Sequence, residues 1–138
     1  MATDAKHGFI IGGHVTLANT ADTKELMEVV TESKTPSGSM VFADKGYASN
    51  NNRCDLEEKQ LTDGIMYKGA RNHPLSEPQR MVNRAISRIR GKVERAFGTL
   101  KKDYRFQRTR YLGCAKVKLE FLLNAMAFNL KKTALMVG

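Results

Sequence analysis

A long helical pattern over residues 76–104 constrains the fold of this chain more than any other feature. Apolar residues recur there at spacings of three and four through six turns, which is the pattern of one buried helix face. Ser76 and Gln79 form a capping pair at its start, and Pro78 is tolerated in a first helical turn. The apolar stripe consists of Val82, Ala85, Ile86, Ile89, Val93, Ala96, Phe97, Leu100 and Tyr104.

Two further features complete the helical half of the chain. Gly91 and Gly98 lie on one face of the long helix, where another element is expected to approach closely. Residues 116–135 predict a final helix that is apolar on most of its circumference and therefore largely buried. We thus expect a helical region over about residues 76–136.

The first half predicts short strands that alternate with helices. Asp22 and Glu25 form a second capping pair before a helix, residues 50–61 predict another helix, and Asp63-Gly64 predicts a turn. Met40–Ala43 is a short apolar run, which is typical of a strand buried on both faces. Together these elements indicate an α/β fold in one domain. The other predicted strands are residues 8–18 and 65–67, with residues 1–3 as the stub of a preceding strand.

The positive charge is confined to the C-terminal part of the chain. Residues 84–138 contain 14 Lys/Arg and 3 Asp/Glu, net +11, whereas residues 1–83 contain 9 and 11, net −2. A basic block within a periodic helix suits a polyanion such as a nucleic acid backbone. A solvated helix face explains the same charges equally well.

Several classes of protein are disfavoured by the sequence. The longest apolar stretch, residues 121–130, is broken by Asn124 and Asn129, so no segment is expected to span a bilayer. The first residues lack the basic and apolar regions of a secretory signal. Cys54 and Cys114 show no metal-ligand spacing, so we expect reduced thiols and a cytoplasmic protein.

Asp44 is the first candidate for chemistry. It follows a predicted buried strand, and open α/β sheets place their active sites at the C-terminal ends of strands. Gly46 lets the chain turn sharply just after it. An aspartate at this position is, however, more often a turn former or a helix cap.

Glu94 is the second candidate. It is the only acidic residue between Arg84 and Lys102, and it follows Val93 at the margin of the apolar stripe. A carboxylate there either forms a surface ion pair, with Arg90 one turn away, or holds a divalent cation. The neighbouring basic residues would then bind the DNA on which the metal acts.

The remaining candidates are weaker. His7, His14 and His73 show no ligand spacing, and no serine or cysteine has the local context of a nucleophile. Lys45 and Tyr47 are either backbone contacts to nucleic acid or ordinary surface residues.

An ordered set of short motifs resembles the DDE transposases of bacterial insertion sequences, in particular the insertion-sequence-five group. The resemblance covers essentially the whole chain, with the motifs in the family's order. The motifs are His14-Val15-Thr16, Ala18-Asn19, Asp22, Val41-Phe42-Ala43-Asp44-Lys45-Gly46-Tyr47, Asn83, Ile86, Arg90, Val93-Glu94, Phe97-Gly98, Leu100-Lys101, Arg110-Tyr111, Gly113 and Asn129-Leu130.

The resemblance implies a ribonuclease-H-like fold, in which helices flank a mixed five-stranded sheet. It also implies a Mg²⁺-dependent enzyme whose two metal ions are held by two aspartates and a glutamate. Asp44 matches the second aspartate and Glu94 the glutamate. The reaction would cut DNA at transposon ends and join a 3′-hydroxyl to target DNA. The expected DNA-binding residues are Lys45, Arg88, Arg90, Lys101 and Lys102.

The sequence departs from the family pattern at its start. The first aspartate and its central strand have no counterpart, because neither Asp4, in a turn, nor Asp22, in a capping pair, matches that position. We therefore interpret residues 1–138 as the C-terminal part of a catalytic domain, with the first strand missing. In the strand order 3-2-1-4-5 this exposes the edges of strands 2 and 4.

Two other functions remain open. The chain could be a non-catalytic DNA-binding remnant, or a partner of full-length transposase or of a second copy. It could also be a ribonuclease-H-like nuclease without transposition, which the ordered motifs make the weaker interpretation.

Overall fold

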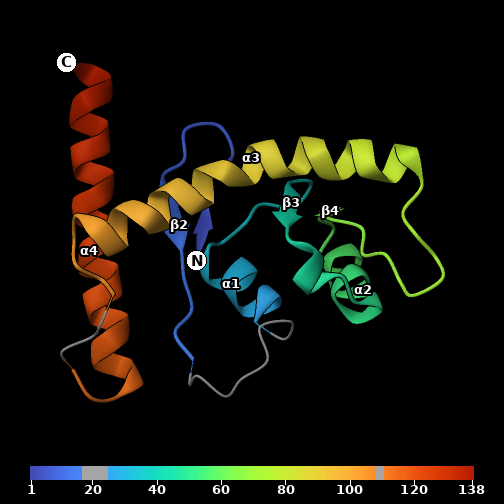
Figure 1. Cartoon of the computed structure of the whole chain (residues 1–138). Helices are drawn as coiled ribbons and strands as arrows, with labels where there is room; N and C mark the ends of the chain where they lie inside the picture. Colours follow the sequence, from blue (N-terminus) through green and yellow to red (C-terminus); the bar gives the residue numbers. More distant parts are fainter. Residues whose placement is uncertain (17–24, 108–110) are drawn as a thin grey trace.

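The computed structural model describes residues 1–16, 25–107 and 111–138, which form a mixed α/β structure. In Figure 1, the long helix α3 crosses one side of the strands, whereas α1 and α2 lie on the other side. Helix α4 stands beside one end of α3. The helices are α1 (Leu26–Glu32), α2 (Asn50–Glu58), α3 (Glu77–Lys102) and α4 (Cys114–Val137). The strands are β1 (Ala2–Thr3), β2 (Ile10–Gly12), β3 (Met40–Ala43) and β4 (Thr62–Ile65).

The described strands form two small sheets and not one continuous sheet. Strand β1 pairs antiparallel with β2, and β3 pairs parallel with β4. The stub predicted at residues 1–3 is confirmed as a strand over Ala2–Thr3. The strand predicted at residues 8–18 is shorter, Ile10–Gly12, and residues 17–18 of that prediction lie outside the described residues. The α/β class is confirmed, and a single five-stranded sheet is absent from the described part.

The turn between β1 and β2 is organised by Asp4. Its carboxylate accepts hydrogen bonds from the backbone N–H groups of Lys6 (2.9 Å), His7 (2.7 Å) and Phe9 (2.7 Å). Partial burial alone raises the pKa of Asp4, but these backbone donors outweigh it and hold the pKa below its usual value. The aspartate therefore has a structural role in the turn, as the sequence predicted.

The turn predicted at Asp63-Gly64 is wrong, because both residues belong to β4. Phe42 of β3 is paired with Gly64, and a Cβ on that glycine would lie 2.8 Å from the carbonyl oxygen of Val41. Glycine is thus needed for close approach of the two strands and not for a turn. The Asp63 side chain accepts a hydrogen bond from the Ile65 N–H (2.8 Å) and pairs with Arg53.

Helix α3 starts as predicted but presents its glycines to open space. Ser76 and Gln79 form a complete capping box, with the side chain of each accepting from the other's backbone N–H. A Cβ added at Gly91 or Gly98 would meet no atom within 4 Å. The close approach predicted at these glycines is therefore wrong for the described residues.

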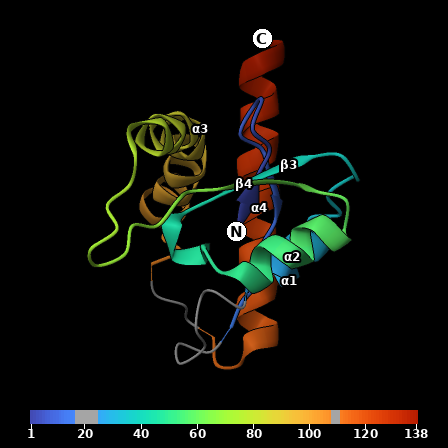
Figure 2. The same ribbon diagram turned by 90° about the vertical axis from the view of Figure 1, so that its right-hand side faces the viewer.

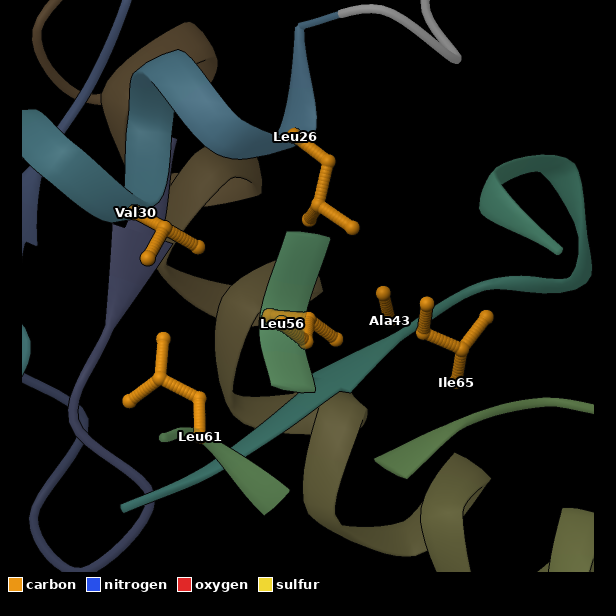
Figure 3. Close-up of a cluster of buried hydrophobic side chains, with 6 residues drawn as sticks. All are labelled: Leu26, Val30, Ala43, Leu56, Leu61 and Ile65. Carbon is orange, nitrogen blue, oxygen red and sulfur yellow. The ribbon is translucent and has the colours of Figure 1, made fainter. Parts of the chain in front are cut away.

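The first hydrophobic cluster joins the β3–β4 pair to α1 and α2 (Figure 3). Leu56 of α2 is completely buried at its centre. Strand β3 is buried only in part, since Met40 remains 50% exposed and the predicted burial on both faces is wrong. The other members are Leu26, Val30, Ala43, Leu61 and Ile65.

The second cluster joins β2 to α3 and α4, with Leu100 fully buried. The side chain of Asn129 fixes α4 on β2, because its amide accepts from the N–H of Ile10 (2.9 Å) and donates to the carbonyl of the same residue (2.8 Å). The remaining members are Ile10, Ala96, Phe121 and Ala125. The Asn83 side chain makes the same two hydrogen bonds to the backbone of Tyr67. Its amide accepts from the Tyr67 N–H (2.7 Å) and donates to the Tyr67 carbonyl (2.9 Å).

Helix α4 is much less buried than its composition predicted. Figure 2 shows its C-terminal end extending beyond the other helices and strands. One face packs through Phe121 and Ala125, and the opposite apolar side chains are open to solvent. No helix among the described residues is long and apolar enough to cross a membrane. The exposed large apolar residues of α4 are Leu119, Leu122, Leu123, Met126, Leu130, Leu135, Met136 and Val137.

The smaller predicted helices need two corrections. Helix α2 ends at Glu58, before the predicted limit of residue 61. Helix α1 begins at Leu26, later than the predicted capping pair implied, with Glu25 at the N-cap and no capping hydrogen bond from the Glu25 side chain. Asp22, the other member of that pair, lies outside the described residues.

Candidate active site

Asp44 lies where β3 ends and a short 3₁₀ helix, Lys45–Tyr47, begins. Its carboxylate caps that helix by accepting a hydrogen bond from the Lys45 N–H at 2.7 Å. The side chain is nevertheless 42% exposed, so one oxygen serves the cap while the group stays accessible. The structural role and the site role of this residue are therefore compatible.

Glu94 projects from the middle of α3 and is more exposed than its sequence position suggested. Its side chain is 68% exposed, so it lies outside the apolar stripe and not at its buried margin. The Arg90 guanidinium, one turn earlier, is its ion-pair partner, with Nη2 3.6 Å from Oε1. This is the ordinary i, i+4 pair that the sequence allowed.

Arg90 brings the two acids into one site. Its Nη1 lies 3.5 Å from Oδ1 of Asp44, while Nη2 contacts Glu94. The same Nη1 donates to the Met66 sulfur at 3.7 Å, just beyond the end of β4. One half-buried guanidinium thus links two carboxylates that are 50 positions apart in the sequence and belong to a strand end and a helix. The two acids predicted as site residues therefore share one cationic neighbour.

The pair offers suitable but incomplete ligands for a hard divalent cation. Two carboxylates that share one cationic partner have the donor chemistry that Mg²⁺ prefers. Among the described residues, the group of three His, Cys, Asp or Glu side chains close enough to share an ion is His14, Glu25 and Glu28, and it includes neither acid. No third carboxylate of the described chain therefore joins Asp44 and Glu94.

A cavity of about 600 Å³ lies beside Asp44, between the two small sheets. It is lined by Ala2 and Thr3 of β1 on one side and by the whole of β3 on the other. Among the described strands, β1 is hydrogen-bonded to β2 and β3 is hydrogen-bonded to β4, and β1 and β3 are not paired with each other. Asp44 and Arg90 also line this cavity, so it opens directly onto the candidate site.

The predicted DNA-binding residues fall into two environments. Lys45, Arg88, Lys101 and Lys102 are exposed, as a backbone contact requires. Lys101 Nζ lies 4.4 Å from the centre of the Phe97 ring, which orients that cation on the surface of α3. Arg90 is the exception, because its guanidinium is engaged by the two acids.

A cluster around His14 was missed by the sequence reasoning. His14 Nε2 lies 2.6 Å from Glu28 and 3.5 Å from Glu25, and Nδ1 lies 3.2 Å from Glu32. Lys118 of α4 completes the network at 2.6 Å from Glu32. These contacts join the segment after β2 to α1 and α4. No local spacing reveals them, because the histidine and the glutamates come from different elements.

Within this network, the pKa of the Glu32 carboxyl group is shifted. The hydrogen bond from Lys118 holds the pKa of Glu32 below its usual value, with a smaller contribution from His14, against the opposing effect of slight burial. The cluster therefore stabilises the packing of three elements.

Comparison with known proteins identifies the family. The model of the family described as "Transposase DDE domain" matches residues 1–130, so the chain belongs to the DDE transposase family, which is a family of enzymes. The chain is 45% identical over 132 residues to the transposase for insertion sequence element IS1106 of Neisseria meningitidis serogroup B. The match covers 96% of this chain but 45% of that relative. No solved structure matches the chain.

Proposed function

We propose that this chain is the C-terminal part of the catalytic domain of an insertion-sequence transposase, of the insertion-sequence-five group. Asp44 and Glu94 would be two of the three carboxylates that hold its Mg²⁺ ions. The observation that carries the proposal is the shared contact of both acids with Arg90, together with the family membership. The proposed location is the cytoplasm, and the proposed partners are transposon-end and target DNA.

The chemistry of the side chains supports a phosphoryl-transfer role. Two Mg²⁺ ions supply an activated oxygen nucleophile and stabilise the leaving oxygen of an in-line displacement. Asp44, fixed at a strand end by its cap, and Glu94, fixed on a long helix, would hold such ions from opposite sides. Arg90 would position both carboxylates before the metal binds. The exposed cations Lys45, Arg88, Lys101 and Lys102 would bind the DNA backbone.

The cavity between the sheets supports the ribonuclease-H-like fold implied by the family. The resemblance puts the first strand, with the first aspartate, between the strands that correspond here to β1 and β3. A cavity lined by these two strands and ending at Asp44 has the position that such a strand requires. We propose that another part of the transposase, in the same polypeptide or a second one, provides it by β-sheet addition.

A non-catalytic role is the second candidate, and two observations favour it. No third carboxylate of the described chain joins Asp44 and Glu94, and residues 84–138 carry a net charge of +11. In this role the chain would bind DNA, or associate with full-length transposase or a second copy, without cutting DNA.

Both candidates can be tested with the purified chain. We expect no strand transfer by the chain alone, because one ligand of the proposed site is missing. Mg²⁺-dependent end cleavage that is abolished in Asp44→Ala would show instead that the chain is sufficient for catalysis. DNA binding should fall on charge reversal at Arg88, Lys101 and Lys102, with a weaker salt dependence. Asp44→Ala and Glu94→Ala should leave that affinity intact. A DNA affinity that does not change between low and physiological salt would contradict binding through the DNA backbone.

A further inference from the structure

A second cavity, of about 320 Å³, lies between the β1–β2 turn, α3 and α4. It shares no lining residue with the cavity beside Asp44, so it is a separate site. The turn contributes His7 and Gly8, the two helices contribute most of the remaining walls, and Tyr104 comes from the segment just after α3. Three elements that are distant in the sequence therefore converge on one depression.

The lining of this cavity is basic and contains no acidic residue. Lys92 and Arg95 come from α3, Lys131 and Lys132 come from α4, and His7 comes from the turn. Like charges brought together in a hollow repel one another, and an anion that binds among them offsets that repulsion. Thr99 and Tyr104 add two hydroxyl groups to the same lining, and hydroxyls can donate to a bound oxygen.

The four Lys and Arg side chains are of two kinds. Lys92 donates to the backbone carbonyls of Ala5 and Lys6, so it fixes the turn on α3. Lys132 lies over the rings of Phe9 and Phe128, with Nζ 6.0 and 5.8 Å from their centres. These two cations are therefore oriented by contacts within the protein.

The other two cations are available to a ligand. Arg95 and Lys131 are exposed, and one comes from each helix. A guanidinium presents a planar set of donors that matches two oxygens of one phosphate, while an ammonium group acts as a compact charge. A preformed basic hollow with one available arginine and one available lysine is suited to a single phosphodiester group.

We propose that this hollow, the turn–α3–α4 pocket, binds a backbone phosphate of DNA. The inference rests on the proposed function, since it assumes that the chain acts on DNA. It adds a site that anchors the duplex away from Asp44 and Glu94, using residues outside the five cations predicted from the sequence. Such an interaction positions DNA without reading its sequence.

The experiment compares two double charge reversals of equal net charge. Arg95→Glu/Lys131→Glu alters the pocket, and Lys34→Glu/Lys68→Glu alters two lysines elsewhere. None of the four side chains is buried, so both variants should fold, which circular dichroism can verify. Affinity for a short DNA duplex is measured by fluorescence anisotropy at several salt concentrations. Inorganic phosphate serves as a second probe, monitored by amide chemical shifts.

The pocket variant should bind DNA at least about tenfold more weakly than the control variant at low salt. The slope of log K against log salt should become shallower by about 0.9 for each DNA phosphate that the variant no longer neutralises. Inorganic phosphate should shift the amide signals of His7, Gly8 and Thr99 in the wild type and not in the pocket variant.

Equal reductions of affinity in the two variants, with wild-type binding intact, would overturn the pocket proposal and leave the DNA-binding function standing. Absence of salt-dependent DNA binding by the wild-type chain would instead contradict the proposed function itself. Phosphate-induced shifts at the pocket without any DNA binding would also overturn the proposal, since the site would then bind a free anion and not a DNA backbone.

Discussion

The Arg90 guanidinium lies 3.5 Å from Asp44, and through this contact a strand end and a long helix share one charged site. Its other amino group lies 3.6 Å from Glu94. Since a cation already lies between the two acids, a divalent metal that uses them must compete with the arginine or displace it. This site and the packing that supports it are open to direct measurement.

Replacement of Arg90 by glutamine should increase the response of the chain to divalent ions. The variant removes two partly exposed ion pairs, which should cost about 0.5–1 kcal/mol of unfolding free energy. It also frees both carboxylates, so Mn²⁺ should raise its melting temperature more than that of the wild type. The measurement is thermal unfolding with and without Mn²⁺. An equal response in Arg90→Gln/Asp44→Asn/Glu94→Gln would show that the ion binds elsewhere.

Replacement of Gly91 and of Gly13 by alanine should change the unfolding free energy in opposite directions. Alanine at Gly91 meets open space within α3 and should stabilise the fold by about 0.5–1 kcal/mol through helix propensity. Alanine at Gly13 would bring its Cβ to 2.4 Å from the buried Phe121 ring, so it should destabilise the fold by about 1–3 kcal/mol. Urea unfolding of both variants checks the prediction, and equal effects would contradict the described packing of α4 on the segment after β2.

Asn129 should be a structural residue, although it belongs to the motifs that carry the family resemblance. Asn129→Ala leaves the N–H and carbonyl of Ile10 without their amide partner, which should cost about 1–3 kcal/mol. Hydrogen exchange at the Ile10 amide should accelerate in the same variant. Unchanged stability and exchange would mean that α4 is held on β2 by apolar packing alone.

Acid unfolding should depend on the contact between Glu32 and Lys118. The pKa of Glu32 is lowered in the folded chain, so this carboxylate stabilises the fold above its ordinary value of 4.5. That contribution disappears as the pH falls through the lowered folded pKa. Lys118→Met removes the main cause and should move the midpoint of acid unfolding to higher pH, as monitored by circular dichroism. A matched Lys116→Met variant, on the exposed side of α4, should leave the midpoint unchanged.

The elements with strong local signals were predictable from the sequence. The capping box at Ser76 and the periodic apolar stripe located α3, and the short apolar run Met40–Ala43 located β3. Both rest on interactions within a few residues. The position of Asp44 at the end of a strand followed from the same pattern.

The remaining features depend on contacts between distant segments. Asp63-Gly64 has the composition of a turn, yet pairing with β3 makes it a strand. Apolar composition predicted burial of α4, but composition does not specify which face finds a partner. Likewise, the His14 cluster and the turn–α3–α4 pocket each assemble residues from three elements, so no spacing along the chain could reveal them.

A chimeric transposase tests most directly whether Asp44 and Glu94 belong to a catalytic site. This chain would replace the 132-residue segment that it matches in the IS1106 transposase, with the rest of that protein retained. Excision of a marked element would be measured in cells for the chimera and for its Asp44→Asn, Glu94→Gln and Glu58→Gln variants, with protein levels verified. We predict excision by the chimera, a decrease of at least about a hundredfold in the first two variants, and no decrease in the exposed control. Excision that survives Asp44→Asn or Glu94→Gln would contradict the account.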